Sequence, residues 1–232
     1  MTRTRLTTAA AFALAAAFAL APGAEPRADK APARADSFRR VPKVNADAPP
    51  DRAAFEFESG GFNYHVAANG NGRRMKRDRA RRFNLWLAGR NFVEGLRFAV
   101  HEGDLLLLCE LNDGEARTGL VVRLEQPSMR ALWRSPVPAA EVGEPLRDGH
   151  DLYVTGADFV ARLDLRTGGY VWQHEEIGDE IAEVRGGAAR PFGSFETPEP
   201  AGDAVLFRER AVYNPPRTLV VNRKTGDIIR IE

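Results

Sequence analysis

Cysteine is almost missing from this sequence, which has one cysteine among 232 residues. A single cysteine cannot form an intramolecular disulfide, so no disulfide framework stabilises this chain. Cys109 lies in the apolar run Leu105–Leu111 and has no adjacent basic residue, which predicts a small buried apolar side chain. A reactive thiol is the alternative, and it would need solvent access and a lowered pKa.

Catalytic and metal-binding motifs are equally scarce. No two of the four histidines lie within a metal-ligand spacing, and no Cys-x-x-Cys or Gly-x-Ser-x-Gly motif is present. The pair Gly70-x-Gly72 lacks the third glycine of a dinucleotide fingerprint, because Met75 stands there. The sequence therefore predicts no catalytic residue, no cofactor and no metal site. Surface or turn positions are favoured for the histidines over a folded metal site. They are His65, His101, His150 and His174.

An excess of charge of one sign is also missing. The chain carries 33 basic and 32 acidic residues, and two of the basic ones, Arg3 and Arg5, precede the apolar N-terminal run. This near balance excludes a general nucleic-acid binder, which needs a basic surface.

Long apolar runs are limited to the N-terminus. Ala9–Ala21 contains only Ala, Phe and Leu, follows two arginines and is followed by small residues. This pattern predicts an export signal over residues 1–24, with cleavage between Ala21 and Ala24. An uncleaved anchor is the alternative, although a membrane span needs about 20 apolar residues. We therefore expect an exported protein, periplasmic or secreted, with no transmembrane segment after signal removal.

Residues 25–52 have few large apolar side chains. They contain five prolines, six alanines and twelve charged residues. Such a segment buries too little surface to offset its ordering entropy, which predicts a flexible linker. A tether that holds the domain away from a membrane or cell wall is the functional interpretation.

From residue 53 onward, short runs of alternating apolar residues are separated by turn signals. This pattern predicts an all-β domain over residues 53–232. One exception is a stretch in which Ile177, Ile181 and Val184 recur at helical spacing, which predicts a short inserted helix near 177–185. The acids around it indicate a solvated helix face, with a calcium site as the alternative.

A turn followed by a tryptophan recurs along this domain. Two copies lie 39 residues apart, and a third follows after 58 residues. A repeat of about 40 residues with several strands is typical of propeller blades, with units of about 53–90, 91–136, 137–178 and 179–232. Asp78 and Trp86 form a weak fourth match. The three better copies are Glu125, Ser128, Met129 and Trp133; Asp164, Thr167, Gly168 and Trp172; and Asn222, Thr225, Gly226 and Arg230.

The copy at 161–172 resembles the repeat of PQQ-type (quinoprotein-like) β-propellers, Ala-x-Asp-x-x-Thr-Gly-x-x-x-Trp. Arg162 replaces the alanine, and the Asp, Thr, Gly and Trp positions match. The resemblance covers roughly residues 93–232, is good in one copy, and implies about four antiparallel blades whose tryptophans dock blade to blade. The family includes quinone-dependent dehydrogenases and exported scaffolds such as the outer-membrane assembly propeller.

The enzymes' paired adjacent cysteines and calcium-ligand set have no match here. We therefore expect an exported, non-enzymatic binding or scaffold module that contacts an envelope or extracellular protein. A quinoprotein-type cofactor-binding or redox enzyme relic is the alternative.

The strongest local bias is a basic run between two turn signals. Seven of the ten residues in 73–82 are basic. One interpretation is an exposed hairpin loop whose charges keep it solvated. The other is an anion-binding patch for an acidic glycan, a lipid headgroup or an acidic partner. The basic residues are Arg73, Arg74, Lys76, Arg77, Arg79, Arg81 and Arg82.

Overall fold

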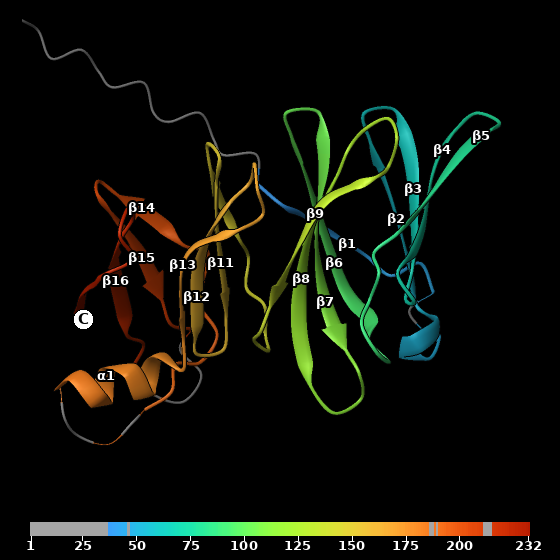
Figure 1. Cartoon of the computed structure of the whole chain (residues 1–232). Coiled ribbons are helices and arrows are strands. Elements are labelled where there is room, and N and C mark those ends of the chain that lie inside the picture. Colours follow the sequence, from blue (N-terminus) through green and yellow to red (C-terminus); the bar gives the residue numbers. More distant parts are fainter. Residues whose placement is uncertain (1–36, 46, 186–187, 189, 211–214) are drawn as a thin grey trace, which may run out of the picture. The chain divides into compact units, whose positions relative to one another are not determined.

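The computed structural model describes residues 37–45, 47–185, 188, 190–210 and 215–232. The predicted export signal and the first part of the predicted linker lie outside these residues. The described chain forms four antiparallel sheets, one short α-helix and a 3-10 turn, η1 (Pro50–Arg52) (Figure 1). The all-β prediction is therefore confirmed.

Each sheet follows the chain as a meander of neighbouring strands. The first sheet contains β2 (Ala54–Ser59), β3 (Phe62–Ala67), β4 (Asn71–Lys76) and β5 (Arg79–Asn84). The second contains β6 (Phe92–His101), β7 (Asp104–Asn112), β8 (Arg117–Leu124) and β9 (Ala131–Val137), with β1 (Arg39–Val41) at its edge. The third contains β10 (Leu146–Asp148), β11 (Asp151–Gly156), β12 (Phe159–Asp164) and β13 (Tyr170–Glu175). The fourth contains β14 (Glu199–Ala201), β15 (Ala204–Arg208), β16 (Thr218–Asn222) and β17 (Ile228–Ile231).

Part of the segment predicted as linker is strand in the structure. β1 pairs with β6 through Arg39↔Phe98 and Val41↔Leu96. Phe38 and Val41, two of the few large apolar side chains of this segment, are buried. Their burial offsets the ordering entropy that the composition of the whole segment argued against.

Three apolar clusters join consecutive sheets. The first lies between the first and second sheets, the second between the second and third, and the last between the third and fourth. β7 belongs to two of them, because Leu105 and Leu107 face the first cluster while Leu106 and Leu108 face the second. A strand buried on both faces has no polar alternation, which explains the apolar run around Cys109. Cys109 is fully buried, and burial raises its pKa to about 12, so the prediction of an inert apolar side chain is confirmed.

The predicted inserted helix is present as α1 (Ile177–Arg185), between β13 and β14. Ile177 is fully buried, and Ile181 packs against the third cluster. Val184 is 81% exposed, so the apolar stripe is one residue shorter than predicted. Most acids of this region are exposed, as the solvated-face interpretation expects. The exposed ones are Glu175, Glu176, Asp179 and Glu183.

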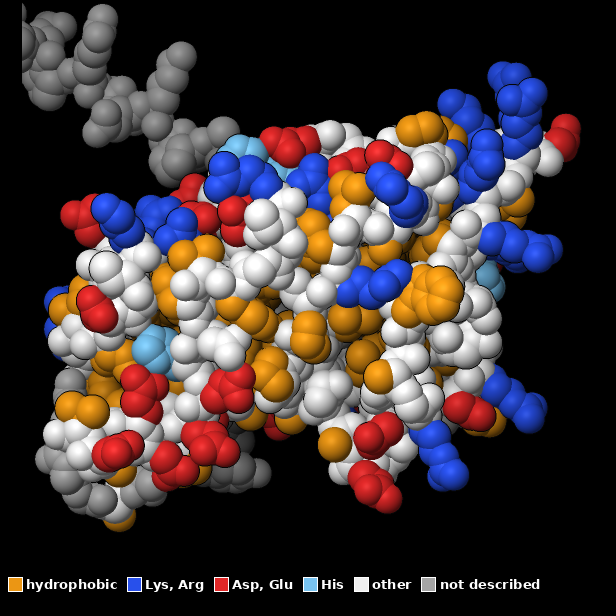
Figure 2. Space-filling view, in the orientation of Figure 1, with side chains coloured by type: hydrophobic (Ala, Val, Ile, Leu, Met, Phe, Trp, Pro, Cys, Tyr) orange, Lys and Arg blue, Asp and Glu red, His pale blue; other side chains and the backbone are white. Residues whose placement is uncertain are grey.

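The basic run is a hairpin of two strands and not a loop, and six of its seven basic side chains are exposed, as the solvated-hairpin interpretation expects. Figure 2 shows basic side chains gathered over β4 and β5. Its residues form strands β4 and β5, and the turn between them is Arg77-Asp78. Arg77 has a positive φ of 50°, as a tight hairpin turn requires. The run therefore has two strand faces, and the basic side chains are divided between them.

Candidate anion-binding site

The β4–β5 hairpin places like charges directly opposite one another. The Cα partners are Arg73↔Arg82, Arg74↔Arg81 and Lys76↔Arg79. Because successive side chains of a strand point to opposite faces, the last two pairs share one face and the first pair lies on the other. Like charges across a strand pair destabilise it, so the fold carries an unfavourable electrostatic term here.

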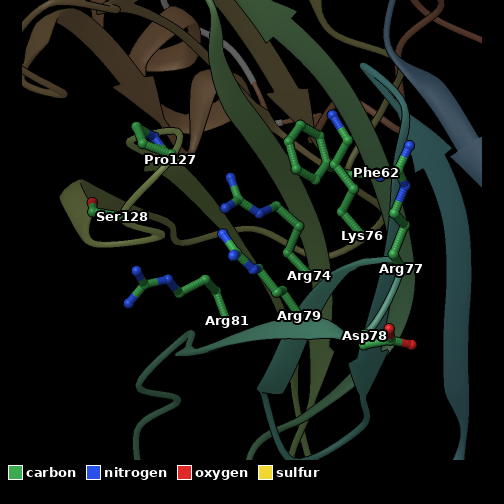
Figure 3. A pocket seen from close by; sticks show the side chains of 9 residues that line it. All are labelled: Phe62, Arg74, Lys76, Arg77, Asp78, Arg79, Arg81, Pro127 and Ser128. Atoms are coloured by element: carbon green, nitrogen blue, oxygen red, sulfur yellow. The ribbon is translucent and has the colours of Figure 1, made fainter.

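A groove of about 930 Å³ lies along the face with the two basic pairs (Figure 3). Its walls come from the first sheet and from the turn between β8 and β9 of the second sheet. Arg74, Arg79 and Arg81 are directed toward that turn in Figure 3. The lining residues are Phe62, Arg74, Lys76, Arg77, Asp78, Arg79, Arg81, Pro127 and Ser128.

Arg74 is the buried cation of this groove. It is 7% exposed, and its Nη1 has no hydrogen-bond partner. Its guanidinium carbon lies 4.3 Å from the centre of the Phe62 ring, and the Lys76 Nζ lies 4.7 Å from the same centre. A buried charge without a counter-ion is costly, and a ring face offsets only part of that cost.

The protein provides little negative charge to these cations. Within the described chain, none of the seven basic side chains of the hairpin forms an ion pair. Tyr64 is the Cα partner of Arg74 on β3. It is not a counter-ion, because burial raises the pKa of its phenol by more than the charge of Arg74 lowers it. Gln126 Nε2 donates a hydrogen bond of 2.7 Å to the Tyr64 hydroxyl. Asp78, in the turn, is the acid among the residues that line the groove.

This arrangement suits an anion with several oxygens. Arginine presents a planar fork of N–H donors that matches carboxylate, phosphate and sulfate groups. Residues two positions apart on a strand are about 7 Å apart, so the two basic pairs form two adjacent positive positions. Arg73 and Arg82 lie on the opposite face of the hairpin and line a separate groove with His65 and Phe83.

The structural repeat residues occupy equivalent turns in three sheets. These turns join the third and fourth strands of the second, third and fourth sheets. Met129, Gly168 and Gly226 all have positive φ, at 62°, 74° and 87°. The first residue of each turn accepts a hydrogen bond from the Ser or Thr three positions later. The Ser128 hydroxyl donates to the Glu125 carboxylate, the Thr167 N–H to the Asp164 carbonyl, and the Thr225 N–H to Asn222 Oδ1.

Two tryptophans connect a sheet with the next turn. The Trp133 Nε1 donates to the Leu165 carbonyl at 2.9 Å, and the Trp172 Nε1 donates to the Arg223 carbonyl at 3.0 Å. A Cβ on Gly168 would lie 2.5 Å from the Trp133 ring, so the ring lies directly against that glycine. The weak fourth match differs, because Asp78 lies in the two-residue hairpin turn and Trp86 follows β5 with 69% exposure.

Sequence reasoning missed the arginines that accompany these tryptophans. The Arg123 Nη1 donates to the Leu165 carbonyl at 2.8 Å, and the Arg162 Nη1 donates to the Arg223 carbonyl at 2.7 Å. The two arginines have the same 39-residue separation as the tryptophans, and each stands two positions before its turn. This position two residues before each turn could have identified both arginines as part of the repeat. Phe62 and Tyr64 gave none, because their role depends on contact with residues of other strands.

Comparisons with known proteins give no family. No protein-family model and no curated protein matches this sequence. Among solved structures, a bifunctional GH43-CE protein from Bacteroides eggerthii is 11% identical with a TM-score of 0.34. It covers 76% of this chain, and this chain spans 27% of its length. The computationally designed Ika8 protein is 8% identical with a TM-score of 0.27, over 76% of this chain and 85% of that one.

Two further findings bear on the predicted classes. Within the described part of the chain, no helix is long and apolar enough to cross a membrane. The adjacent cysteines of the quinoprotein enzymes have no counterpart, because the sequence has one cysteine and it is buried in β7.

Proposed function

We propose that this protein is an exported, non-enzymatic binding module that holds an anionic ligand in the groove beside the β4–β5 hairpin. The observation that carries the proposal is Arg74, whose buried Nη1 lacks a hydrogen-bond partner in a groove that four further cations line. An anion that enters the groove would satisfy that nitrogen after a rotation of the Arg74 guanidinium toward it. It would also remove the repulsion between the two basic pairs.

Next to the fourth sheet, a second arginine lies over an aromatic ring and also has the carboxylate partner that Arg74 lacks. Arg217 lies over the Phe192 ring at 3.6 Å, as Arg74 lies over Phe62. The Arg217 Nε also donates to Glu209 at 3.0 Å, and its other nitrogens donate to backbone carbonyls. Arg74 thus has the aromatic partner of Arg217 but not the carboxylate, and the ligand's anionic group would take the place of that carboxylate.

The proposal includes a β-propeller-like array of about four blades of the quinoprotein-like type. Its support is the recurrence of the tryptophan contact between the second and third sheets and between the third and fourth. In this interpretation Trp172 and Asp164 are structural residues, and the ligand site lies on the blade whose tryptophan does not dock.

The spacing of the two basic pairs favours a ligand with repeated charges. A sulfated or phosphorylated glycan has acidic groups at separations comparable with the roughly 7 Å between the pairs. The ligand would lie along the hairpin, in a groove large enough for several such groups.

Two double variants test the site with the same change in net charge. Arg79→Gln with Arg81→Gln removes two cations from the groove, and Arg73→Gln with Arg82→Gln removes two from the opposite face. On immobilised heparin, a sulfated polysaccharide, we expect the first variant to elute at clearly lower salt than the wild type, and the second to elute close to it. Equal shifts for both variants would mean that overall charge, and not the groove, causes retention.

The same protein can be tested for the two other expectations. Crosslinking in whole cells should trap the protein with a specific envelope partner, and recovery of uncrosslinked monomer alone would contradict a scaffold role. Addition of PQQ with calcium should leave the thermal midpoint unchanged, since a bound cofactor would raise it by mass action. An upward shift would replace the present proposal with the quinoprotein alternative.

A further inference from the structure

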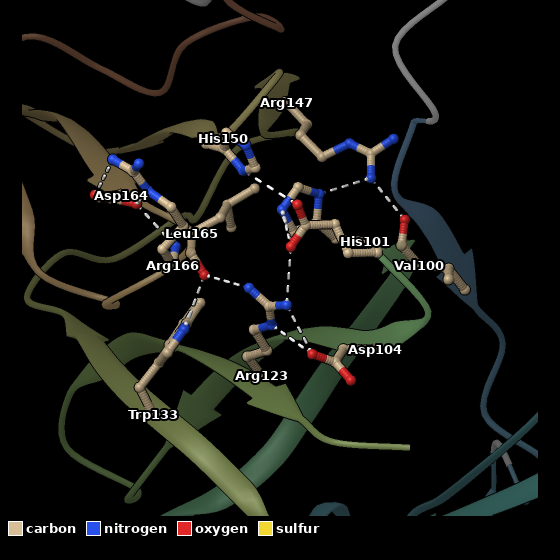
Figure 4. A network of polar contacts seen from close by, with 11 residues as sticks. Val100, His101, Asp104, Arg123, Trp133, Arg147, His150, Asp164, Leu165 and Arg166 are labelled. Carbon is tan, nitrogen blue, oxygen red and sulfur yellow. Dashed lines mark hydrogen bonds and ion pairs between the residues drawn. The ribbon is translucent and has the colours of Figure 1, made fainter. Parts of the chain in front are cut away.

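Two histidines that are 49 residues apart in the sequence meet at the junction of the second and third sheets. His101 ends β6, Glu102 follows in the β6–β7 turn, and His150 lies in the β10–β11 turn. One ligand atom from each of the three residues lies within 4.8 Å of the others. The two imidazole rings meet edge to face, with centres 5.4 Å apart (Figure 4).

The tight β6–β7 turn sets the position of the carboxylate. Glu102 and Gly103 have positive φ values of 51° and 85°, as a two-residue hairpin turn requires. Glu102 Oε2 then lies 3.7 Å from His101 Nε2, and Glu102 Oε1 lies 3.6 Å from His150 Nδ1. The carboxylate is therefore between the two rings.

A second observation points to a ligand at this place. His101 is 6% exposed, and its Nε2 is buried without a hydrogen-bond partner. Buried polar atoms are normally paired, so this nitrogen has an unused position for a ligand.

We propose that His101, Glu102 and His150 bind one divalent transition-metal ion of the Zn²⁺ class between the second and third sheets. Two imidazole nitrogens and one carboxylate oxygen are a ligand set that Zn²⁺ accepts, with a fourth position for water. In a tetrahedral zinc site the ligand atoms are about 3.3 Å apart. The separation between His150 and Glu102 exceeds this by a few tenths of an ångström, and all three ligand atoms lie within 4.8 Å of one another. Side-chain rotations that bring them closer by up to about 1.5 Å would close the site. Glu102 and His150 are half-exposed, which gives the ion a path from solvent.

The neighbouring arginines define how the ion would be held. The Arg123 Nη2 lies 3.2 Å from Glu102 Oε2, so it can orient the carboxylate while Oε1 binds the ion. The Arg147 Nη1 lies 3.4 Å from His101 Nδ1 and donates to the Val100 carbonyl at 2.6 Å. Metal binding through Nε2 puts the ring proton on Nδ1, so the ion and Arg147 favour opposite tautomers of His101.

The test uses tag-free protein that has been treated with a chelator and titrated with Zn²⁺ by calorimetry. We expect one ion per chain, and a metal-dependent rise of the thermal midpoint because the ion binds the folded protein. Glu102→Gln and His150→Ala should each weaken binding at least roughly tenfold. Both side chains are half-exposed, so we expect these variants to keep the fold, and the thermal midpoint without metal measures this. His65→Ala, which changes a histidine of the first sheet, should bind like the wild type.

Two further readouts separate this site from general surface binding. Co²⁺ in place of Zn²⁺ should give the visible absorption of a tetrahedral ion, and His150→Ala should remove it. Arg147→Gln, which removes the cation that favours the competing tautomer, should tighten Zn²⁺ binding. Unchanged affinity in Glu102→Gln and His150→Ala, or weaker binding in Arg147→Gln, would overturn the proposal. These results are independent of the heparin experiment, because the metal site and the groove share no residue.

Discussion

The first and fourth sheets solve the same local problem in different ways. Each places an arginine over a phenylalanine ring, Arg74 over Phe62 and Arg217 over Phe192. Arg217 pairs with Glu209, and the two residues adjoin the ends of β16 and β15, whereas Arg74 has no carboxylate partner and has a buried nitrogen without a hydrogen bond. The Arg217–Glu209 pair shows that an arginine over a phenylalanine ring can have a carboxylate counter-ion within this chain. Among the described residues Arg74 has no such counter-ion, and this difference is what the proposed ligand site rests on.

The first sheet also differs from the second and third in the position of its tryptophan. Trp133 and Trp172 each lie against the turn of the next sheet and donate a hydrogen bond to it. The first sheet has Trp86 instead, which is 69% exposed and has the Arg134 guanidinium 5.6 Å from its ring centre. The repeated residues thus hold the sheets together, and the sheet that departs from the repeat carries the unpaired charges.

The largest expected effect compares two tryptophans. Trp172→Ala removes a ring that is 8% exposed and packs on Gly226, so we expect a loss of about 3–5 kcal/mol in the free energy of unfolding. Trp86→Ala should change it by less than about 0.5 kcal/mol. Urea unfolding monitored by circular dichroism measures both. A cost near zero for Trp172→Ala would contradict its role between sheets.

Two glycines in turns of the fourth sheet test the contact between Trp172 and Gly226 by changes at the glycine. Gly226 has a φ of 87°, and a Cβ there would lie 2.7 Å from the Trp172 ring. Gly202 has a φ of 61° and no neighbour within 4 Å of the added Cβ. Gly226→Ala should therefore cost about 2–4 kcal/mol, from backbone strain and overpacking, and Gly202→Ala about 1 kcal/mol from strain alone. Equal costs in urea unfolding would show that the ring contact contributes little.

The internal counter-ion of the fourth sheet gives a pH-dependent prediction. Burial of Glu209 opposes its ionisation, but Arg217 and the Gly193 N–H outweigh burial and lower the pKa of the carboxyl. Because folding favours the ionised form, this stabilisation is complete above the ordinary glutamate pKa of about 4.3. It is lost as the pH falls through the lower folded-state value.

Glu209→Gln should therefore cost about 1–3 kcal/mol at neutral pH, and the difference from the wild type should shrink toward zero in acid. Urea unfolding at a series of pH values measures it. A difference that is the same at every pH would mean that the charge of Glu209 is not what stabilises Arg217. Such a result would also weaken the comparison with Arg74.

The sequence predicts the parts of this molecule that depend on local pattern. Strand alternation gave the all-β class, the spacing of Ile177 and Ile181 gave α1, and the turn residues gave the 39-residue repeat. These signals are local because side-chain period and turn geometry are properties of neighbouring residues.

The groove and the histidine cluster depend on contacts between distant residues. The composition of 73–82 identified the cations, but the hairpin register decides that Arg74 and Arg81 share a face and that Arg73 does not. Phe62 on β3 and Pro127 in the β8–β9 turn complete the groove from other parts of the chain. His101 and His150 meet because two sheets pack, and no spacing in the sequence encodes that meeting.

The smallest expected effect is an increase, not a loss, in the free energy of unfolding, and it tests the like-charge repulsion in the β4–β5 hairpin. Without ligand, Arg79→Gln with Arg81→Gln removes one member of each like-charge pair in the groove, so the free energy of unfolding should rise by up to about 1 kcal/mol at low salt. Added salt screens the repulsion in the wild type, and the gain should disappear as ionic strength increases. Urea unfolding at low and high salt measures this, with Arg208→Gln as control because Arg208 is paired with Glu199 at 3.1 Å and should gain nothing. A protein that becomes more stable when it loses its ability to bind heparin has retained those cations for binding, whereas a loss of stability would mean that they hold the hairpin together.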